Sequence, residues 1–154
     1  AFAVTHTPVS PAYGYRFDYR GRSVVVSGDT VKDKGLIAVA KGADVLVHEA
    51  QANHIVSIMH EEAEKIGRSR VAKILHDIPT YHTSPVEAAE AANEAGVRLL
   101  VLYHLTPPPP NAPLVERVFV RGVSAVRPNG WVLADDGLLV TLPANSDAVV
   151  VGHL

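Results

Sequence analysis

The sequence predicts an α/β fold in which helices cover a mixed β-sheet. Three apolar stretches have the length and composition of buried strands; they are VVV (24–26), ADVLVHEA (43–50) and VRLLVLYHL (97–105). Segments of helical composition separate them. The resulting order of strand, helix, strand, two helices and strand is typical of helices layered on a sheet.

The composition is that of one folded domain, and it excludes several kinds of site. The 154 residues are 47% hydrophobic and 19% charged, which is enough apolar material for a core. Without cysteine, any metal would have to be held by imidazole and carboxylate. No apolar run reaches the ~20 residues of a membrane span, and the net charge of -2 comes without a basic cluster. The chain starts at Ala1 without Met, so we expect an upstream piece to be missing and leave the localisation open.

The first part of the chain has the pattern of a β-hairpin and a short helix. Aromatic and polar residues alternate in YGYRFDY (13–19), as in a half-buried strand, and Arg20-Gly21 supplies the turn into the first apolar run. The stretch VKDKGLIAVAKGA (31–43) then favours a helix that ends at Gly42.

Three further helices are predicted between the second and third apolar runs. Residues 55–77 are rich in Ala, Glu, Lys and Ile, and Gly67 divides them into two helices. In TSPVEAAEAANEAG, Ser84 and Glu87 form a capping box, and Gly96 ends the helix.

The last third of the chain contains a proline run and several short elements. Pro107–Pro110 cannot be helix or central strand and predict a surface excursion. A short helix near 112–121 and strands in WVLADDG, LLVTLP and AVVVGHL follow. Asp136-Gly137 has the composition of a hairpin turn between the first two of these strands.

Polar residues stand where the three buried strands end. Asp29, the pair His48-Glu49 and His104 occupy these positions, and His82 precedes the capped helix. In layered α/β folds the strand ends at one edge of the sheet line the crevice that binds ligands. Nitrogen and oxygen donors suit Zn²⁺, Mn²⁺ or Fe²⁺, and an Asp at a strand end can bridge two ions.

Ordinary structural roles explain the same residues equally well. Asp29 could cap the following helix, Glu49 could be a buried salt-bridge partner, and His82 could cap the helix that starts at Ser84. The other histidines stand in helical, loop or terminal contexts and carry no such pattern; they are His54, His60, His76 and His153.

Four stretches in a fixed order resemble a known family. VTHTPVSPAYGYRFDYRGRSVV, VSGDT, VLVHEA and YHTSPVEAAEAANEAGVRLLVLYH are similar to the second half of a metallo-β-lactamase-fold hydrolase, above all its ribonuclease Z/arylsulfatase-like branch. The resemblance covers residues 3–106. It implies an αββα sandwich, of which residues 1–154 form the second half as a single domain.

The resemblance also implies roles for five residues. His6 is similar to a ligand of a first metal ion, Asp29 to the carboxylate that bridges two ions, and His104 to a ligand of the second. Glu49 and His82 fall where ribonuclease Z-like members place a proton-donating pair near the scissile phosphate. The implied cofactor is two divalent metal ions, zinc first, with manganese or iron as alternatives.

One part of the family pattern is missing. The H-x-H-x-D-H motif, which family members carry in their first half, occurs nowhere in these 154 residues. The resemblance therefore implies an N-terminal half of the same fold as a partner. A lone second half would expose an apolar sheet face, which is compatible with a homodimer, and would bind metal weakly.

The implied function is metal-dependent hydrolysis of a phosphodiester or related ester by a metal-bound hydroxide. We expect a small-molecule substrate and no membrane partner; nucleic acid is disfavoured because the chain has no basic and aromatic strip. The proline run after His104 could rim a small pocket, although a role as a mere connector is favoured. One alternative is tRNA 3′-processing of the ribonuclease Z type, and another is a non-catalytic half that serves binding or assembly.

Overall fold

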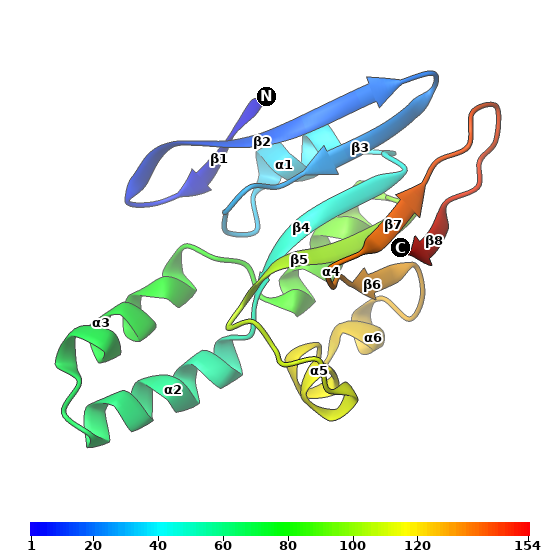
Figure 1. The fold of residues 1–154 in the computed structure, drawn as a ribbon. Coiled ribbons are helices and arrows are strands. Elements are labelled where there is room, and N and C mark those ends of the chain that lie inside the picture. The colour runs from blue at the N-terminus through cyan, green and yellow to red at the C-terminus, as the bar shows by residue number, and fades with distance from the viewer.

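The computed structural model describes all 154 residues and centres on a mixed, six-stranded sheet (Figure 1). The strands lie in the order β1 (Phe2–His6), β2 (Val9–Tyr19), β3 (Arg22–Val26), β4 (Val45–Gln51), β5 (Leu99–Thr106) and β6 (Trp131–Leu133). Strands β1 to β3 pair antiparallel and β3 to β6 pair parallel. The carboxyl ends of β3, β4 and β5 therefore meet at one edge of the sheet.

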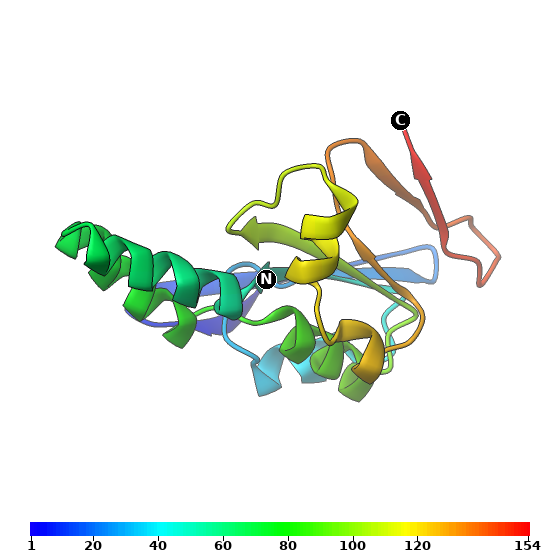
Figure 2. The ribbon, with the colours of Figure 1, turned by 90° about the horizontal axis from the view of Figure 1, so that it is seen from below.

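The helices are divided between one face of the sheet and a projecting hairpin. Figure 2 shows α1 and α4 beneath the sheet, while α2 and α3 extend away from it. The helices are α1 (Lys34–Ala40), α2 (Asn53–Lys65), α3 (Ser69–Asp77), α4 (Pro85–Ala95), α5 (Pro113–Phe119) and α6 (Val123–Val126), with a 3₁₀ turn at Ile78–Thr80. None of them is long and apolar enough to cross a membrane.

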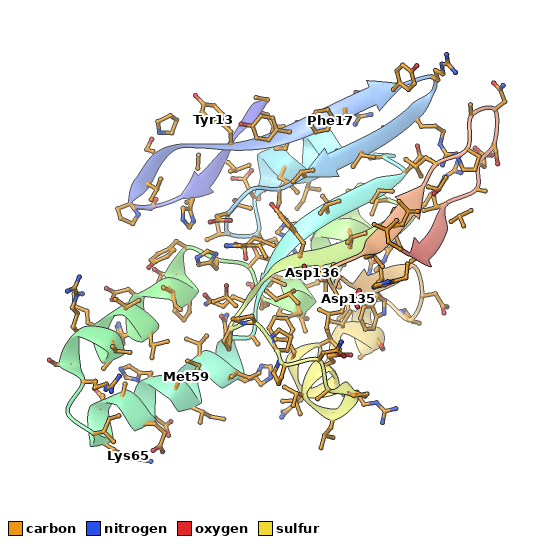
Figure 3. The ribbon with its side chains drawn as sticks, in the orientation of Figure 1. Tyr13, Phe17, Met59, Lys65, Asp135 and Asp136 are labelled. Atoms are coloured by element: carbon orange, nitrogen blue, oxygen red, sulfur yellow. The ribbon has the colours of Figure 1, made fainter.

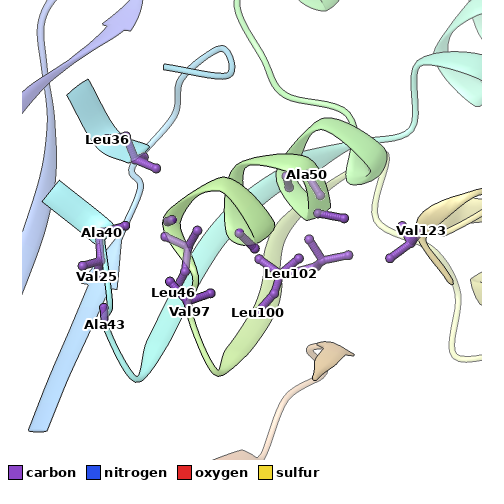
Figure 4. Close-up of a cluster of buried hydrophobic side chains, with 14 of the residues drawn as sticks. Val25, Leu36, Ala40, Ala43, Leu46, Ala50, Val97, Leu100, Leu102 and Val123 are labelled. Atoms are coloured by element: carbon purple, nitrogen blue, oxygen red, sulfur yellow. The ribbon is translucent and has the colours of Figure 1, made fainter. Parts of the chain in front are cut away.

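The main core lies between α4 and the sheet (Figure 4). One face of α4 consists of small side chains, and the fully buried Leu46, Leu100 and Leu102 of β4 and β5 pack beneath it. Alanine lets the helix axis approach the sheet closely while it keeps a high helix propensity. The buried alanines of α4 are Ala88, Ala89, Ala91, Ala92 and Ala95.

The opposite face of the sheet, here called the open face, is covered only in part. Arg16 of β2 donates to the carbonyl of Val39 in α1, so its odd-numbered neighbours point to the open face. Figure 3 labels two of these, Tyr13 and Phe17, which are 47% and 59% exposed. Strand β7 (Leu138–Thr141), which pairs with the exposed β8 (Val150–His153), packs on this face over strands β3 to β6.

Most elements predicted from the sequence are confirmed. The turn at Arg20-Gly21 joins β2 to β3, and both of its residues adopt positive φ, 47° and 76°. Gly67 separates α2 from α3. The capping box of Ser84 and Glu87 is present in α4, which ends at Gly96 with φ 66°.

Two predictions about strands need correction, and one strand was not predicted. Val24–Val26 is not fully buried on both faces, because Val25 on the helix face is fully buried, whereas Val24 and Val26 are only partly buried and Val24 packs against the apolar cluster of the open face. Asp136-Gly137 does not close a hairpin: β6 pairs with β5, and β7 pairs with β8. The parallel pairing continues to Ala134, whose N–H donates to the carbonyl of Leu102, so the chain turns only after leaving the sheet. Strand β1 lies in the opening segment, for which no strand was predicted.

Candidate metal and catalytic site

Asp29 and His104 meet at the carboxyl edge of the sheet. Asp29 follows β3 and His104 lies near the end of β5, and their Oδ1 and Nδ1 atoms are 3.1 Å apart. The side chains are 41% and 48% exposed, so both remain accessible to a ligand. Asp29 does not cap α1, because Asp33 fills that role by accepting the N–H of Leu36 at 3.0 Å.

A glycine sets the position of Asp29. Gly28 has a φ of 62°, and a Cβ built there would collide with the carbonyl oxygen of Tyr13. The loop after β3 thus runs against β2 so closely that only glycine fits. The close contact between Gly28 and Tyr13 fixes the main chain at the end of β3, and with it the position from which the Asp29 side chain extends.

A β-bulge sets the direction of His104. The pairing of β4 with β5 shifts between Glu49 and Ala50, where Tyr103 and Leu105 are the partners and His104 is the extra residue. Its φ is 45°, in the left-handed region that a side chain rarely adopts. Bulges of this kind redirect a side chain next to functional sites, at a cost in backbone strain.

Glu49 and His82 form a buried pair. Glu49 is fully buried, and its Oε1 accepts the Nδ1–H of His82 at 2.8 Å, the N–H of Thr30 at 3.1 Å and the N–H of Thr83 at 3.2 Å. The other carboxylate oxygen, Oε2, has no hydrogen-bond partner. The suggestion that Glu49 is a buried salt-bridge partner is consistent with this pair, whereas His82 does not cap α4, because Ser84 does.

The environment favours the charged form of His82. Burial alone would lower its pKa, but the hydrogen bond to Glu49 and the negative charges of Glu49 and Asp29 outweigh burial. The pKa of His82 is therefore raised above its ordinary value. Because Nδ1 is engaged by Glu49, Nε2 is the nitrogen left to exchange a proton with a ligand.

His6 joins the same group from β1. Its Nδ1–H donates to the carbonyl of Tyr81 at 2.8 Å, which leaves a lone pair on Nε2. The ring of His6 lies 5.0 Å from that of His82, which in turn lies 6.2 Å from that of His104, between ring centroids. The structure thus brings all five predicted site residues, from five separate segments, to one edge of the sheet.

The donors suit part of a metal site. A histidine that donates one N–H to a main-chain carbonyl is set up to ligate through its other nitrogen, as His6 is here. Asp29 and His104 add an oxygen and a nitrogen donor. No three His, Asp or Glu side chains of this chain stand where they could hold one ion together. The chain therefore presents metal donors but not a closed cage.

A cavity of about 840 Å³ opens beside His104. Pro108 and Pro109 line it, so the proline run does border a cavity at the site. Three carboxylates also line it, and Figure 3 shows two of them, Asp135 and Asp136, in the connection between β6 and β7; the third is Glu116. The cavity is thus apolar in part and negatively charged in part.

Several residues that support the site were not predicted from the sequence. Tyr103 lines the cavity next to His104, and Thr30 and Thr83 contribute main-chain donors to Glu49. A residue that acts through its main chain leaves no signature in side-chain identity. The four histidines without a predicted role contact groups outside this site: Val118 O for His54, Glu64 for His60, Asp77 for His76 and Asp135 for His153.

Comparison with known proteins agrees with this fold. The family described as "Beta-lactamase superfamily domain" matches residues 1–105. The metallo-β-lactamase-fold protein YhfI from Bacillus subtilis superposes with a TM-score of 0.59 at 21% identity, covering 88% of this chain and 46% of YhfI. A long-form RNase Z from yeast superposes with a TM-score of 0.56 at 20% identity, covering 86% of this chain and 16% of that protein. These two likenesses concern the fold alone.

Several relatives in sequence are named ribonuclease Z. Proteins named ribonuclease Z from Mycobacterium avium and Mycobacterium tuberculosis are 41% identical over 102 residues, which is 66% of this chain. The chain spans only about a third of their length, 32% and 33%. With a family match over residues 1–105 and relatives named ribonuclease Z at 41% identity, the chain belongs to the metallo-β-lactamase superfamily.

Proposed function

We propose that this chain contributes half of the active site of a metal-dependent phosphodiesterase that cleaves RNA, in the manner of a tRNA 3′-processing ribonuclease Z. The observation that carries the proposal is the meeting of Asp29, His104 and the Glu49–His82 pair at one edge of the sheet. The names of the sequence relatives favour RNA over the small substrate expected from composition. Because nucleic acid is then the substrate, the missing basic strip has to be supplied outside this chain.

His82 would act as the proton donor. Cleavage of a phosphodiester leaves an alkoxide that must be protonated, and a positioned imidazolium supplies that proton from Nε2. The Glu49 carboxylate, held by Thr30 and Thr83, fixes the ring and stabilises its charged form. Thr83 follows His82 directly, so one carboxylate oxygen orients both the ring and the loop that carries it.

His6, Asp29 and His104 would hold divalent metal ions, with zinc the first candidate by donor type. Bound metal ions would lower the pKa of water and offset the charge that develops on the phosphate oxygens. What this chain's residues contribute is placement. Gly28 sets Asp29, the bulge sets His104, and the Tyr81 carbonyl sets His6.

The remaining ligands would come from an N-terminal half of the same fold. Exposed aromatic residues on the open face of β2, among them Tyr15 and Tyr19, are the kind of surface that a second sheet would cover. The absence of three converging donors in this chain agrees with a site that is completed by another half.

A small ester, such as a singly charged phosphodiester, is the second candidate substrate. The 840 Å³ cavity beside His104 favours it, because Glu116, Asp135 and Asp136 would repel a polyanion that entered. Prolines at the rim would also limit the size of the bound group. An RNA substrate would have to reach the metal and catalytic residues without entering this cavity.

The two candidate substrates can be distinguished by assaying one representative of each. The gene's full product, with any sequence encoded upstream of Ala1, is assayed with Mn²⁺ or Zn²⁺ on a precursor tRNA and on bis(p-nitrophenyl) phosphate. We expect cleavage of the tRNA at its 3′ side, and a kcat lowered by about 10²- to 10⁴-fold in His82→Ala. His76→Ala, on the exposed part of α3, serves as the matched control. Hydrolysis of the small diester alone would favour the second candidate, and no metal-dependent hydrolysis of either would refute both.

A further inference from the structure

The imidazole of His48 is buried in the core beside the site. It is fully buried on β4, and its neighbours Leu46 and Ala50 belong to the cluster beneath α4. Alternation along the strand places its side chain on the helix face, opposite the carboxylate of Glu49. Such a position normally holds an apolar residue, as at 46 and 50.

The hydrogen bonding of His48 fixes its tautomer. Nδ1 lies 2.8 Å from the main-chain carbonyl oxygen of Glu49, which can only accept. The proton is therefore on Nδ1, and Nε2 is a bare acceptor. No group in the structure donates to Nε2. The ring thus donates from Nδ1 to Glu49, and its Nε2 has no hydrogen-bond partner in the core.

The bond falls where β4 runs past the end of β3. The Val47 carbonyl accepts the N–H of Ser27, and the N–H of Glu49 donates to Ser27 Oγ, so these main-chain groups of β4 face β3, which ends at Val26. Beyond that end no strand residue faces the Glu49 carbonyl, and a buried carbonyl needs a donor from elsewhere. His48 supplies such a donor to the carbonyl of the residue whose side chain pairs with His82.

We propose that His48 is a positioning residue for Glu49. Its Nδ1–H holds the Glu49 main chain from the helix face, so that the carboxylate on the opposite face stays directed at Thr30, His82 and Thr83. The catalytic meaning of this placement rests on the function proposed above. The placement itself does not, and it can be measured without any substrate.

The first measurement uses the unmodified protein. With ¹⁵N-labelled histidine, long-range ¹H–¹⁵N spectra report the tautomer of each ring. We expect His48 to be neutral and protonated on Nδ1. Protonation on Nε2 alone would mean that the ring does not hold the Glu49 carbonyl, and would overturn the inference whatever the variants do.

The second measurement compares variants through two reporter amides. The N–H groups of Thr30 and Thr83 both donate to Glu49 Oε1, so their proton shifts report where that carboxylate lies. His48→Asn keeps an N–H donor close to the position of Nδ1, whereas His48→Leu removes it. We expect both amides in the Leu variant to move toward their shifts in Glu49→Gln, and both in the Asn variant to stay near wild type.

Unchanged amides in a folded Leu variant would contradict the proposal. If His48→Leu does not fold, His48→Gln replaces it, since Gln carries its donor too far along the side chain to reach the same carbonyl. Equal amide shifts in the Asn and Gln variants would then exclude a positioning role. In the full gene product, the variant without the donor should lose about 10- to 100-fold in kcat with KM unchanged, and Asn should restore most of it. If the wild type shows no hydrolysis at all, the proposed function fails while the amide shifts still decide the role of His48.

Discussion

Asp29 Oδ1 lies 3.1 Å from His104 Nδ1, a contact between the loop after β3 and the bulge of β5. Since neither residue has another strong partner in the structure, we expect the pair to bind metal rather than to stabilise the fold. Asp29→Asn and His104→Ala should each reduce the metal content of the purified full gene product, measured by elemental analysis, by at least half. With the metal removed from all proteins, their unfolding free energies should stay within about 1 kcal/mol of wild type. His60→Ala is the control, and a loss of metal in that variant alone would place the metal site elsewhere.

Gly28 should be the least replaceable glycine near the site. Gly28→Ala adds a Cβ against the Tyr13 carbonyl at a φ of 62°, so we expect a loss of about 2–4 kcal/mol in unfolding free energy. Gly67→Ala is a matched control, because its φ is 71° but nothing lies near the added Cβ. It should cost only about 1 kcal/mol. Urea unfolding measures both, and equal losses would show that the contact with Tyr13 does not matter.

Buried His48 should make stability depend on pH. Burial lowers its pKa, against the smaller effects of its hydrogen bond to Glu49 and of the charges of Glu49 and Glu87. Below about pH 6.5 the unfolded chain takes up a proton on this ring that the folded chain does not. The unfolding free energy should therefore fall as the pH drops below that point, by up to ~1.4 kcal/mol per pH unit. His48→Asn should flatten the slope, whereas His76→Asn should keep it; denaturant titrations between pH 5 and 7 check this.

The ion pair of Arg22 and Asp44 should hold the C-terminal strands on the sheet. The two side chains are 9% and 10% exposed and lie 3.0 Å apart, and Arg22 also donates to the carbonyls of Pro143 and Ala148. Arg22→Met would leave buried Asp44 with only the more distant guanidinium of Arg98, at 3.7 Å, so we expect a cost of about 3 kcal/mol, the lower end for a broken buried pair. Hydrogen exchange in β7 and β8 should accelerate in this variant. Arg16→Met, whose pair with Asp18 is more exposed, is the control, and equal exchange in both variants would argue against an anchoring role.

Elements with strong local signals were predicted well from the sequence. Examples are the capping box of α4, the break at Gly67 and the turn at Arg20-Gly21. Each depends on residues within a few positions of one another, so the sequence itself shows which residues interact. Strand β1 forms a hairpin with β2, in which His6 lies opposite Val9, and β7 forms one with β8, in which Thr141 lies opposite Val150. Neither connection contains the Asn-Gly or Asp-Gly sequence that marks a hairpin turn, whereas Asp136-Gly137 has that sequence and closes no hairpin.

The site was partly predictable for the same reason. Acids and histidines at strand ends pointed to Asp29, Glu49 and His104, because parallel strands share one edge. The means of placement could not be read from the sequence. The collision that reserves position 28 for glycine, and the left-handed backbone of His104, appear only when β2, β4 and β5 are side by side.

The parallel pairing of β3, β4 and β5 has a kinetic consequence. Each of these pairings closes a long loop, with α1 in the first and α2, α3 and α4 in the second. Loop closure of this kind costs chain entropy before any contact repays it, and it slows folding. Asp29, Glu49 and His104 come together only after both loops have closed. We therefore expect the site residues at the carboxyl edge of the sheet to come together last in folding. A refolding chain should recover the circular dichroism of its helices well before it can bind a metal ion.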